Sequence, residues 1–457
     1  MIRKSIVLLL AVLILQTLSA EKMFIQKANA PYDREVRLKH PAQDIFDARQ
    51  LKSDKKRIDP SNNKLIVIMV DFQEEVIDDA STTGNGKFET VPNPDYPITI
   101  GSPPHDMEYY TQMMESLRYY YAAASYGLFD LDYDIWPKDR PAYTLSNPMS
   151  YYSPPNVGSD LFVERLEEFF KEAWETADAI DPEIDFSQYG HFMILHAGSD
   201  WQHDTLGDTP SDMPSLFIKI ATGKEAVVDN GAVLITHSCN VPETISQDPR
   251  EYPYTDEFGN EIGTTVYGYG ATNAVFAHEF GHSMGLVDLY NTYTSYPMVG
   301  YFDIMDSGGA GILQSEGTSD GKLYNIEGGL PALPGAFSRL LMFEDTFREQ
   351  GILKDVTELQ LETPFELSAA ETRVKPTDKL RIIKIPLSDM EYVLLEHRSV
   401  DPDGDGDTAV KSALNQRVIL YPTPRADNFD TPSYEYDYLL PSWQKWNSTA
   451  GWYYSYG

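Results

Sequence analysis

The chain of 457 residues carries 36 basic and 70 acidic side chains, which gives a formal net charge of -34. This length accommodates two or three domains with ordinary hydrophobic cores. The acidic balance repels phosphate backbones and anionic lipid headgroups, so it excludes nucleic acid and membrane surfaces from the expected partners, while acidic side chains stay available for hard cations.

The first 20 residues predict export from the cell. Arg3 and Lys4 precede an apolar run over residues 6–15, and small residues at 17–20 offer a cleavage site. The apolar run is too short for a membrane-spanning helix, which needs about 20 residues. We therefore expect residues 1–20 to be a signal peptide, and the protein to be secreted without membrane insertion once this segment is removed.

Residues 21–60 form a polar segment of mixed charge. Basic side chains cluster near its end, at positions 52, 55, 56 and 57, a pattern typical of a protease-sensitive stretch. Two interpretations stay open, a prosegment of a zymogen and a plain linker. The segment contains no cysteine, so a prosegment here could not inhibit through a thiolate on a metal.

The single cysteine of the chain, Cys239, lies far from this segment. One cysteine excludes an intrachain disulfide, which favours a bacterial extracellular protein over a small disulfide-stapled animal domain.

Residues 61–346 show the apolar periodicity of a domain that mixes strands and helices. The continuous apolar run at 65–72 predicts a strand covered on both faces. Helical spacing predicts a helix over about 107–124, which ends before Gly127, and another over about 160–177. Further elements are expected as strands at 191–196 and 232–236, the latter an exposed edge beside a cleft, and as a helix at 272–284.

Residues 347–457 change to short alternating segments. They predict a β-rich C-terminal module with strands at 358–361, 380–385, 392–396 and 417–421. The aromatic ending at 452–457 lacks a polar tail, which leaves open whether the module extends further.

The sequence His278-Glu279-Phe280-Gly281-His282 carries the strongest chemical signal. Two imidazoles four residues apart lie on one face of a helix, one turn apart, and can bind one zinc ion. Glu279 can act as the general base that deprotonates the metal-bound water, whose pKa zinc lowers towards about 7. The structural alternative is a pair of core histidines with satisfied hydrogen bonds.

The residues after this motif predict the rest of a metal site. Gly285 follows His282 by three residues and allows the chain to leave the helix, so that Asp288 can return as the third zinc ligand. The alternative for Asp288 is a carboxylate that holds His282 without touching the metal. Met305, before Asp306-Ser307-Gly308-Gly309, looks like the methionine turn beneath the metal of metzincins. Asp303 and Asp306, which flank it, are interpreted as hydrogen-bond acceptors that fix this loop.

The stretch from about residue 65 to residue 398 resembles the immune inhibitor A-type family of secreted bacterial metallopeptidases, a metzincin-like group. The matching pieces are residues 67–72, 124–130, 196–198, 278–290, 303–308 and 392–398. The resemblance implies a preproenzyme with an α+β zincin catalytic domain, in which a twisted mixed sheet accompanies the active-site helix, followed by β-rich C-terminal parts. Val287 stands where the family usually has proline, and Asn291 stands where it often has an acid.

A second metal signal lies in the C-terminal region. The aspartates of Asp401-Pro402-Asp403-Gly404-Asp405-Gly406-Asp407 alternate before glycine, as in the first half of a calcium loop. Asp401, Asp403, Asp405 and Asp407 are therefore candidate Ca²⁺ ligands. The alternative is a solvated acidic turn, because Ser412 stands where a full EF-hand loop has glutamate.

Together these motifs predict a secreted zinc endopeptidase that hydrolyses peptide bonds in protein or peptide substrates. One alternative is a non-catalytic extracellular adhesin or binding protein that retains a metallopeptidase scaffold. Another is a secreted glycosidase, which only the abundance of acids favours. Glu279 argues for the peptidase, because a purely structural zinc site has no use for a base. His196 and His203 are interpreted as structural or substrate-rim residues rather than as a second zinc site, and His397 is interpreted as structural.

Overall fold

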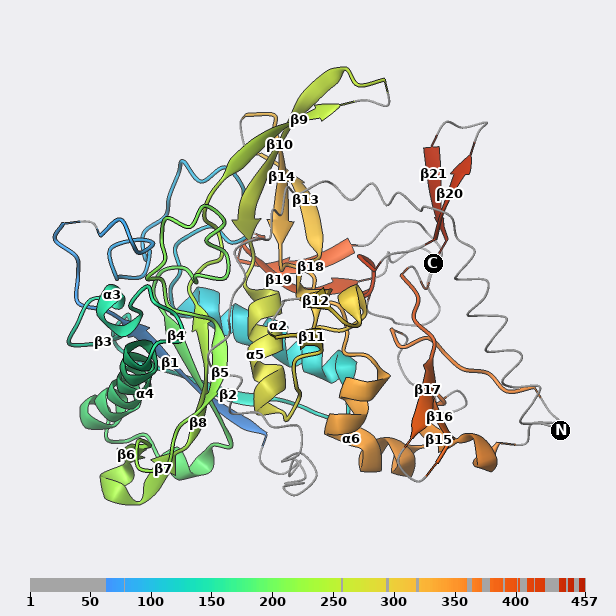
Figure 1. Ribbon diagram of the computed structural model, residues 1–457, viewed down its shortest axis with the longest axis horizontal. Coiled ribbons are helices and arrows are strands. Elements are labelled where there is room, and N and C mark those ends of the chain that lie inside the picture. Colours follow the sequence, from blue (N-terminus) through green and yellow to red (C-terminus); the bar gives the residue numbers. More distant parts are fainter. Residues whose placement is uncertain are drawn as a thin grey trace. The chain divides into compact units, whose positions relative to one another are not determined.

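The computed structural model in Figure 1 describes part of the chain. The described residues are 63–456, apart from 78, 256–257, 293–295, 318–319, 360–363, 372–378, 389–390, 401, 403–408, 415, 424–434, 441–442 and 448–451. The predicted signal peptide, the segment 21–60 and the four candidate calcium ligands Asp401, Asp403, Asp405 and Asp407 lie outside the described residues.

A six-stranded mixed sheet forms the centre of the N-terminal half, in the order β2-β1-β4-β8-β5, with β3 also paired to β1. Its strands are β1 (Lys64–Asp71), β2 (Asp132–Trp136), β3 (Tyr143–Thr144), β4 (His191–His196), β5 (Leu216–Lys219) and β8 (His237–Pro242). All neighbours pair in parallel except β5, which pairs antiparallel with β8 and forms an edge. The mixed sheet and its helices agree with the α/β content of the predicted peptidase domain.

The strand β1 is covered on both faces, as its continuous apolar run predicts. Its alternate residues Ile66, Ile68 and Val70 join a cluster with α4 (Asp160–Ile180). The intervening residues at 65, 67 and 69 join a second cluster with α2 (Met107–Ala124) and α5 (Asn273–Ser283). Side chains of a strand alternate between faces, so one run of apolar residues supplies both cores. Figure 1 shows α4 on one side of the sheet and α2 with α5 on the other.

The helix α2 begins and ends where the sequence predicts. Asp106 caps its first turn by accepting a hydrogen bond from Tyr109 N at 3.0 Å. Beyond its last residue, Gly127 adopts a left-handed φ of 79° and donates its N–H to Ala122 O at 2.7 Å. A glycine accepts this conformation without steric cost, which explains the sharp end of the helix.

One predicted strand takes a different place in the structure. The segment 232–236 contains β7 (Val233–Ile235), which forms a two-stranded hairpin with β6 (Ala226–Val228). The edge of the central sheet is instead β5, a strand that the apolar pattern did not predict. The pattern of three or four apolar residues marks a strand but carries no information about its neighbour.

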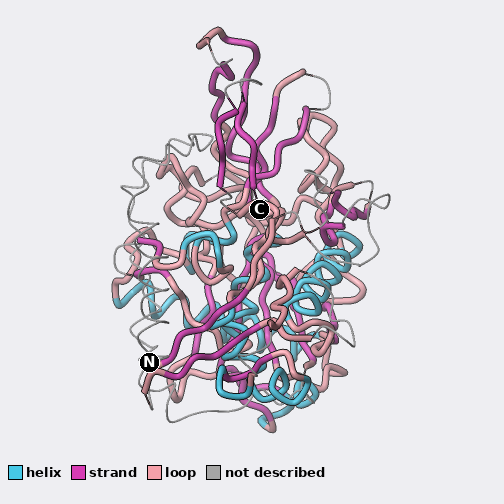
Figure 2. The backbone as a smooth tube through the Cα atoms, turned by 90° about the vertical axis from the view of Figure 1, so that its right-hand side faces the viewer, coloured by secondary structure: helices cyan, strands magenta, loops and turns pink. Residues whose placement is uncertain are grey.

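A second sheet of four strands has the order β13-β14-β10-β9. Its strands are β9 (Arg250–Thr255), β10 (Glu261–Gly270), β13 (Ile312–Glu316) and β14 (Leu323–Glu327). Figure 2 shows these strands as long neighbouring segments. The chain passes from β10 into α5 within three residues, and Ala271 N donates to Glu327 O at 2.8 Å, so this sheet fixes where α5 begins.

The C-terminal strands follow the helix α6 (Ala336–Gln350). They are β15 (Leu353–Asp355), β16 (Ile382–Pro386), β17 (Tyr392–Glu396), β18 (Ala409–Ala413), β19 (Val418–Thr423), β20 (Trp443–Asn447) and β21 (Trp452–Tyr456). The prediction that a strand begins at residue 358 is wrong. Glu358 accepts a hydrogen bond from Asp355 N at 2.7 Å and closes a capping box on a short 3-10 helix, so β15 ends before it.

Residues from these C-terminal strands share a hydrophobic cluster with α2 and α5. Leu353, Ile382 and Val418 belong to the same buried cluster as Tyr120 and Phe280. The boundary after residue 346 and the β-rich module of 347–457 stay predictions. Within the described part of the chain, no helix has the length and apolarity that crossing a bilayer requires.

Candidate metal centre

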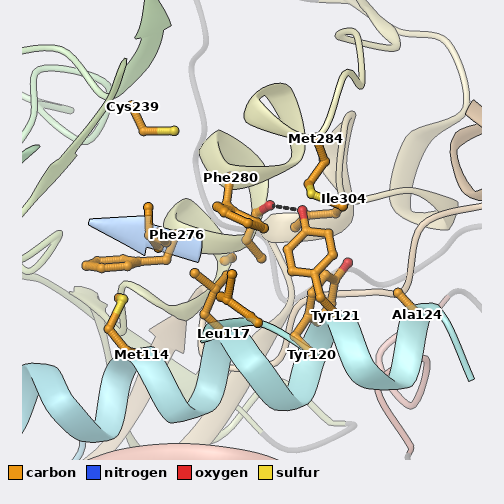
Figure 3. Packing of buried hydrophobic residues seen from close by; sticks show 14 of the residues in the cluster. Met114, Leu117, Tyr120, Tyr121, Ala124, Cys239, Phe276, Phe280, Met284 and Ile304 are labelled. Atoms are coloured by element: carbon orange, nitrogen blue, oxygen red, sulfur yellow. Dashed lines mark hydrogen bonds between the residues drawn. The ribbon is translucent and has the colours of Figure 1, made fainter. Parts of the chain in front are cut away.

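The helix α5 places His278, Glu279 and His282 near the outer edge of the central sheet. Its other face is apolar: Phe280 packs against Tyr121 of α2 with ring centroids 5.0 Å apart, and the Tyr121 hydroxyl donates to Ala277 O at 2.6 Å. Figure 3 shows this hydrogen bond and the packing of Phe276 and Phe280 above α2. Burial of this face leaves the two histidines on the half-buried face, with ring centroids 4.9 Å apart.

Gly281, between the two histidines, is required by its surroundings. A Cβ added there would lie 2.9 Å from Met305 Sδ and 3.0 Å from the Tyr121 hydroxyl. Real Cβ contacts this short are strongly repulsive, so any larger residue would force Met305 or Tyr121 away from the helix. No local pattern in the sequence predicts this requirement for Gly281.

The chain reverses direction immediately after α5. Gly285 has a left-handed φ of +92°, which glycine adopts readily, and Leu286 N donates to Gly281 O at 2.9 Å. The reversal brings Asp288 Oδ1 to 3.2 Å from His278 Nε2 and 3.3 Å from His282 Nε2. The structure thus places the three predicted zinc ligands together.

These separations fit a single ion. Zinc donors at about 2.0–2.2 Å in a tetrahedral arrangement lie roughly 3.3–3.6 Å from one another. The three donor atoms all lie within 4.8 Å of one another. The donor set of two imidazole nitrogens and one carboxylate oxygen is also the type that a catalytic zinc site uses.

Backbone carbonyl groups set the orientation of both imidazoles. His278 Nδ1 lies 2.9 Å from Ile304 O, and His282 Nδ1 lies 3.1 Å from Leu286 O. A carbonyl oxygen only accepts, so each Nδ1 carries the hydrogen and each Nε2 faces Asp288. No sequence pattern predicts these two carbonyl groups, because their positions depend on the chain path after the helix.

The group formed by His278, His282 and Asp288 strongly favours a bound positive charge. Burial disfavours protonation of His278, but the hydrogen bond and charge of Asp288 outweigh it and raise the pKa of His278 to about 9. Burial favours the neutral form of Asp288, yet the two histidines hold the pKa of its carboxyl well below its ordinary value. A carboxylate between two imidazoles therefore requires a cation, which either a proton or a divalent metal supplies.

Glu279 lies beside this group and does not belong to it. Its side chain is 6% exposed, and within the described part of the chain its Oε2 has no hydrogen-bond partner. Burial raises the pKa of Glu279 to about 7, although the neighbouring His278 and His282 lower it in part. A carboxyl group with this pKa can accept and release a proton near neutral pH.

The predicted methionine turn, residues 302–309, lies beneath α5. Met305 is fully buried, and its N–H donates to Asp303 Oδ1 at 3.0 Å. Asp303 also accepts from Gly335 N at 2.8 Å and from the Ser338 hydroxyl at 2.7 Å. Asp306 Oδ2 accepts from three consecutive backbone N–H groups, those of residues 298–300. Both aspartates therefore act as the loop-fixing acceptors that the sequence analysis expects.

Two further features escaped the sequence analysis. Asp200 is fully buried and raises the pKa of Glu279, and it binds His203 Nδ1 at 2.5 Å. A second group of potential metal ligands among the described residues combines Asp204, Asp208 and Asp248. Asp200 and His203 are close in the sequence, but their pattern matches no known motif, and Asp248 meets Asp204 and Asp208 only through the fold. His196 is fully buried, and burial lowers its pKa to about 4.

Comparison with known families agrees with this site. The model of the immune inhibitor A peptidase M6 catalytic domain matches residues 51–326, a range that contains His278, Glu279, His282, Asp288 and Met305. No curated protein matches the chain. Peptidases of this family depend on a metal and act on protein or peptide substrates. Since the match covers more than half of the sequence, the chain belongs to the immune inhibitor A peptidase family M6 and is a metallopeptidase.

Proposed function

We propose that the protein is a secreted zinc endopeptidase with a metzincin-like active site. The observation that supports this most directly is the meeting of His278 Nε2, His282 Nε2 and Asp288 Oδ1 at separations that suit one tetrahedral ion. Imidazole nitrogen favours zinc over calcium or magnesium, which prefer oxygen ligands only. The buried Met305 beneath the helix supports the metzincin-like assignment.

In this proposal each residue has a separate task. His278, His282 and Asp288 hold the ion, and the carbonyl groups of Ile304 and Leu286 keep the two imidazoles in the ligating tautomer. When bound, zinc lowers the pKa of water and polarises the scissile carbonyl group.

Glu279 moves the proton. Its Oε2, which has no hydrogen-bond partner among the described residues, accepts a proton from the attacking water molecule as the C–O bond forms at the scissile carbonyl. The same carboxyl group then delivers the proton to the leaving amine as the C–N bond breaks. Burial raises the pKa of Glu279 to about 7 in the metal-free site, and this direction strengthens the carboxylate as a proton acceptor.

The sequence features outside the described residues complete the proposal. The signal peptide over residues 1–20 supports secretion, and the basic stretch near residue 57 supports a zymogen activated by cleavage. Asp401, Asp403, Asp405 and Asp407 are proposed to bind Ca²⁺ and to stabilise the C-terminal region. Thermal midpoints that are identical in calcium and in a calcium-selective chelator, with zinc saturating, would contradict this calcium site.

The central test measures metal and activity on the purified protein. We expect one zinc per chain, cleavage of casein or gelatin, and loss of cleavage in phenanthroline that added zinc reverses. A protein that binds zinc but cleaves neither substrate after removal of residues 21–60 would instead support the non-catalytic binding protein.

A further inference from the structure

Two carbonyl groups of the methionine turn hold the metal ligands in place. Ile304 O accepts from His278 Nδ1 at 2.9 Å, and Met305 O accepts from Leu289 N at 2.8 Å, next to Asp288. One ligand from the helix and one from the returning chain therefore depend on the same two peptide groups. A shift of this turn would move His278 and Asp288 relative to each other.

Arg398 forms a hydrogen bond with the backbone at the beginning of this turn. Its Nη1 donates to Phe302 O at 2.9 Å, and its Nη2 donates to Leu333 O at 3.0 Å. Phe302 immediately precedes Asp303, whose carboxylate binds both Met305 N and Gly335 N. The guanidinium group thus connects the segment at Phe302 with the segment at Leu333, and these two segments enclose Asp303. Arg398 follows β17 in the chain.

The guanidinium group is itself held by a buried carboxylate pair. Asp437 Oδ1 accepts from Arg398 Nη2 at 2.6 Å, its Oδ2 accepts from Nε, and the side chains of Arg398 and Asp437 are 7% and 0% exposed. Asp437 Oδ1 also accepts from Leu333 N at 3.0 Å. Glu371 Oε1 lies 3.5 Å from Arg398 Nε, and its Oε2 accepts from Ser399 N at 3.1 Å.

Three carboxyl groups, those of Glu371, Glu396 and Asp437, lie close to the Arg398 guanidinium group. Burial favours the neutral form of Asp437, but Arg398 outweighs it and lowers the pKa of Asp437 to about 2. Burial and the nearby Asp437 raise the pKa of Glu371 well above its ordinary value. Glu396 Oε1 also lies 3.5 Å from Arg398 Nη1. An arginine fork is well matched to such carboxyl groups and to two carbonyl groups.

We propose that Arg398 is a positioning residue for the metal site, which acts through the backbone of residues 302–305 on His278 and Asp288. This inference rests on the metal ligands of the proposed function, but its test does not require proteolysis. Arg398 and Asp437 both lie beyond residues 51–326, the range that the family model matches. In this proposal, residues of the C-terminal region help to hold the metal ligands in position.

The test compares three variants of the full-length protein with a matched control. Arg398→Gln removes the cation. Arg398→Lys keeps the charge but cannot bind Asp437 and both carbonyl groups together. Asp437→Asn weakens the interaction with the guanidinium group. The control is Arg348→Gln, which removes a half-exposed arginine of α6 whose partners are Glu344 and Asp355. Zinc affinity is measured by competition with a chromogenic chelator, and hydrogen exchange is measured over residues 286–306 in zinc-free protein.

We expect Arg398→Gln to bind zinc roughly 10–100-fold more weakly than the wild type, as is typical when a group that orients a ligand is lost. The zinc affinity of Arg398→Lys should lie between those of the wild type and Arg398→Gln. The Leu289 amide should exchange faster than in the wild type in both Arg398 variants. The control Arg348→Gln should match the wild type in both measurements. If Arg398→Gln does not fold, Arg398→Lys decides the question.

Zinc affinity within twofold of the wild type and unchanged exchange over residues 286–306, in a folded Arg398→Lys or Arg398→Gln protein, would overturn the proposal. If the wild type binds zinc but does not cleave protein, the proposed function fails while the zinc-affinity comparison still decides the role of Arg398. The two failures are therefore distinguishable.

Discussion

Replacement of Glu279 by glutamine isolates the proton-transfer step from metal binding. Glutamine keeps the shape of the side chain but cannot accept a proton at the position of Oε2. Loss of a positioned general base lowers rates by about 10²–10⁴-fold, which corresponds to about 3–5 kcal/mol of activation free energy. We therefore expect kcat to fall by this factor.

The structure also predicts what Glu279→Gln leaves unchanged. The three donor atoms that meet at the metal site belong to His278, His282 and Asp288, so zinc content should stay at the wild-type level. Glu279 Oε2 has no hydrogen-bond partner in the described part of the chain, so no internal hydrogen bond is lost there. We expect the thermal midpoint of the zinc-loaded variant to stay within roughly 1 °C of the wild type, which corresponds to about 1 kcal/mol for a chain of this size.

The assay combines zinc quantification with cleavage of a fluorogenic peptide under saturating substrate. Glu344→Gln is the matched control, because Glu344 binds Lys384 and Arg348 on the surface of α6 and should leave kcat unchanged. Activity of Glu279→Gln within roughly tenfold of the wild type would refute the role of Glu279 as general base. Loss of zinc from this variant would show instead that Glu279 contributes to metal binding.

Three further predictions test the architecture around the site. Asp288→Ala should weaken zinc binding by at least about 10–100-fold and Asp288→His should partly restore it, as chelator competition would show; wild-type affinity in the alanine variant would remove Asp288 from the ligand set. Gly281→Ala should lower the free energy of unfolding by about 1–2 kcal/mol, because the clash of its Cβ with Met305 Sδ outweighs the better helix propensity of alanine; an unchanged urea midpoint would contradict this packing. Burial opposes the charge of His203, but Asp200 raises its pKa from 6.5 to about 9, so the folded state binds this proton more tightly than the unfolded state. This stabilisation, up to about 3 kcal/mol, is complete below pH 6.5 and is lost as pH rises towards 9; His203→Asn should therefore reduce the free energy of unfolding at pH 6 but not at pH 9.5, and an equal effect at both would refute the ion pair.

The C-terminal strands show where local patterns stop being sufficient. Alternation predicted strands at 380–385, 392–396 and 417–421, and the structure has β16, β17 and β19 at nearly the same positions. It missed β15, a strand of three residues that is too short to show a period. It also placed a strand at Glu358, where a capping hydrogen bond favours a 3-10 helix.

The sequence by itself determined those parts of the metal site that are local in the chain. The spacing of His278 and His282 places both on one face of α5 because a helix repeats every 3.6 residues, and Gly285 ends that helix because it adopts a left-handed conformation that other residues resist. The continuous apolar run of β1 likewise predicted a strand covered on both faces, because alternate side chains point to opposite faces.

Only the tertiary structure decided what fixes these ligands in space. The carbonyl group that selects the tautomer of His278 comes from Ile304, 26 residues further along the chain. The guanidinium group that holds Phe302 comes from Arg398, 96 residues away, and its own carboxylate partner Asp437 is 39 residues beyond that. Such contacts depend on the path of the whole chain and leave no periodic trace in the sequence, whereas helices, turns and doubly covered strands arise from the conformational preferences of neighbouring residues.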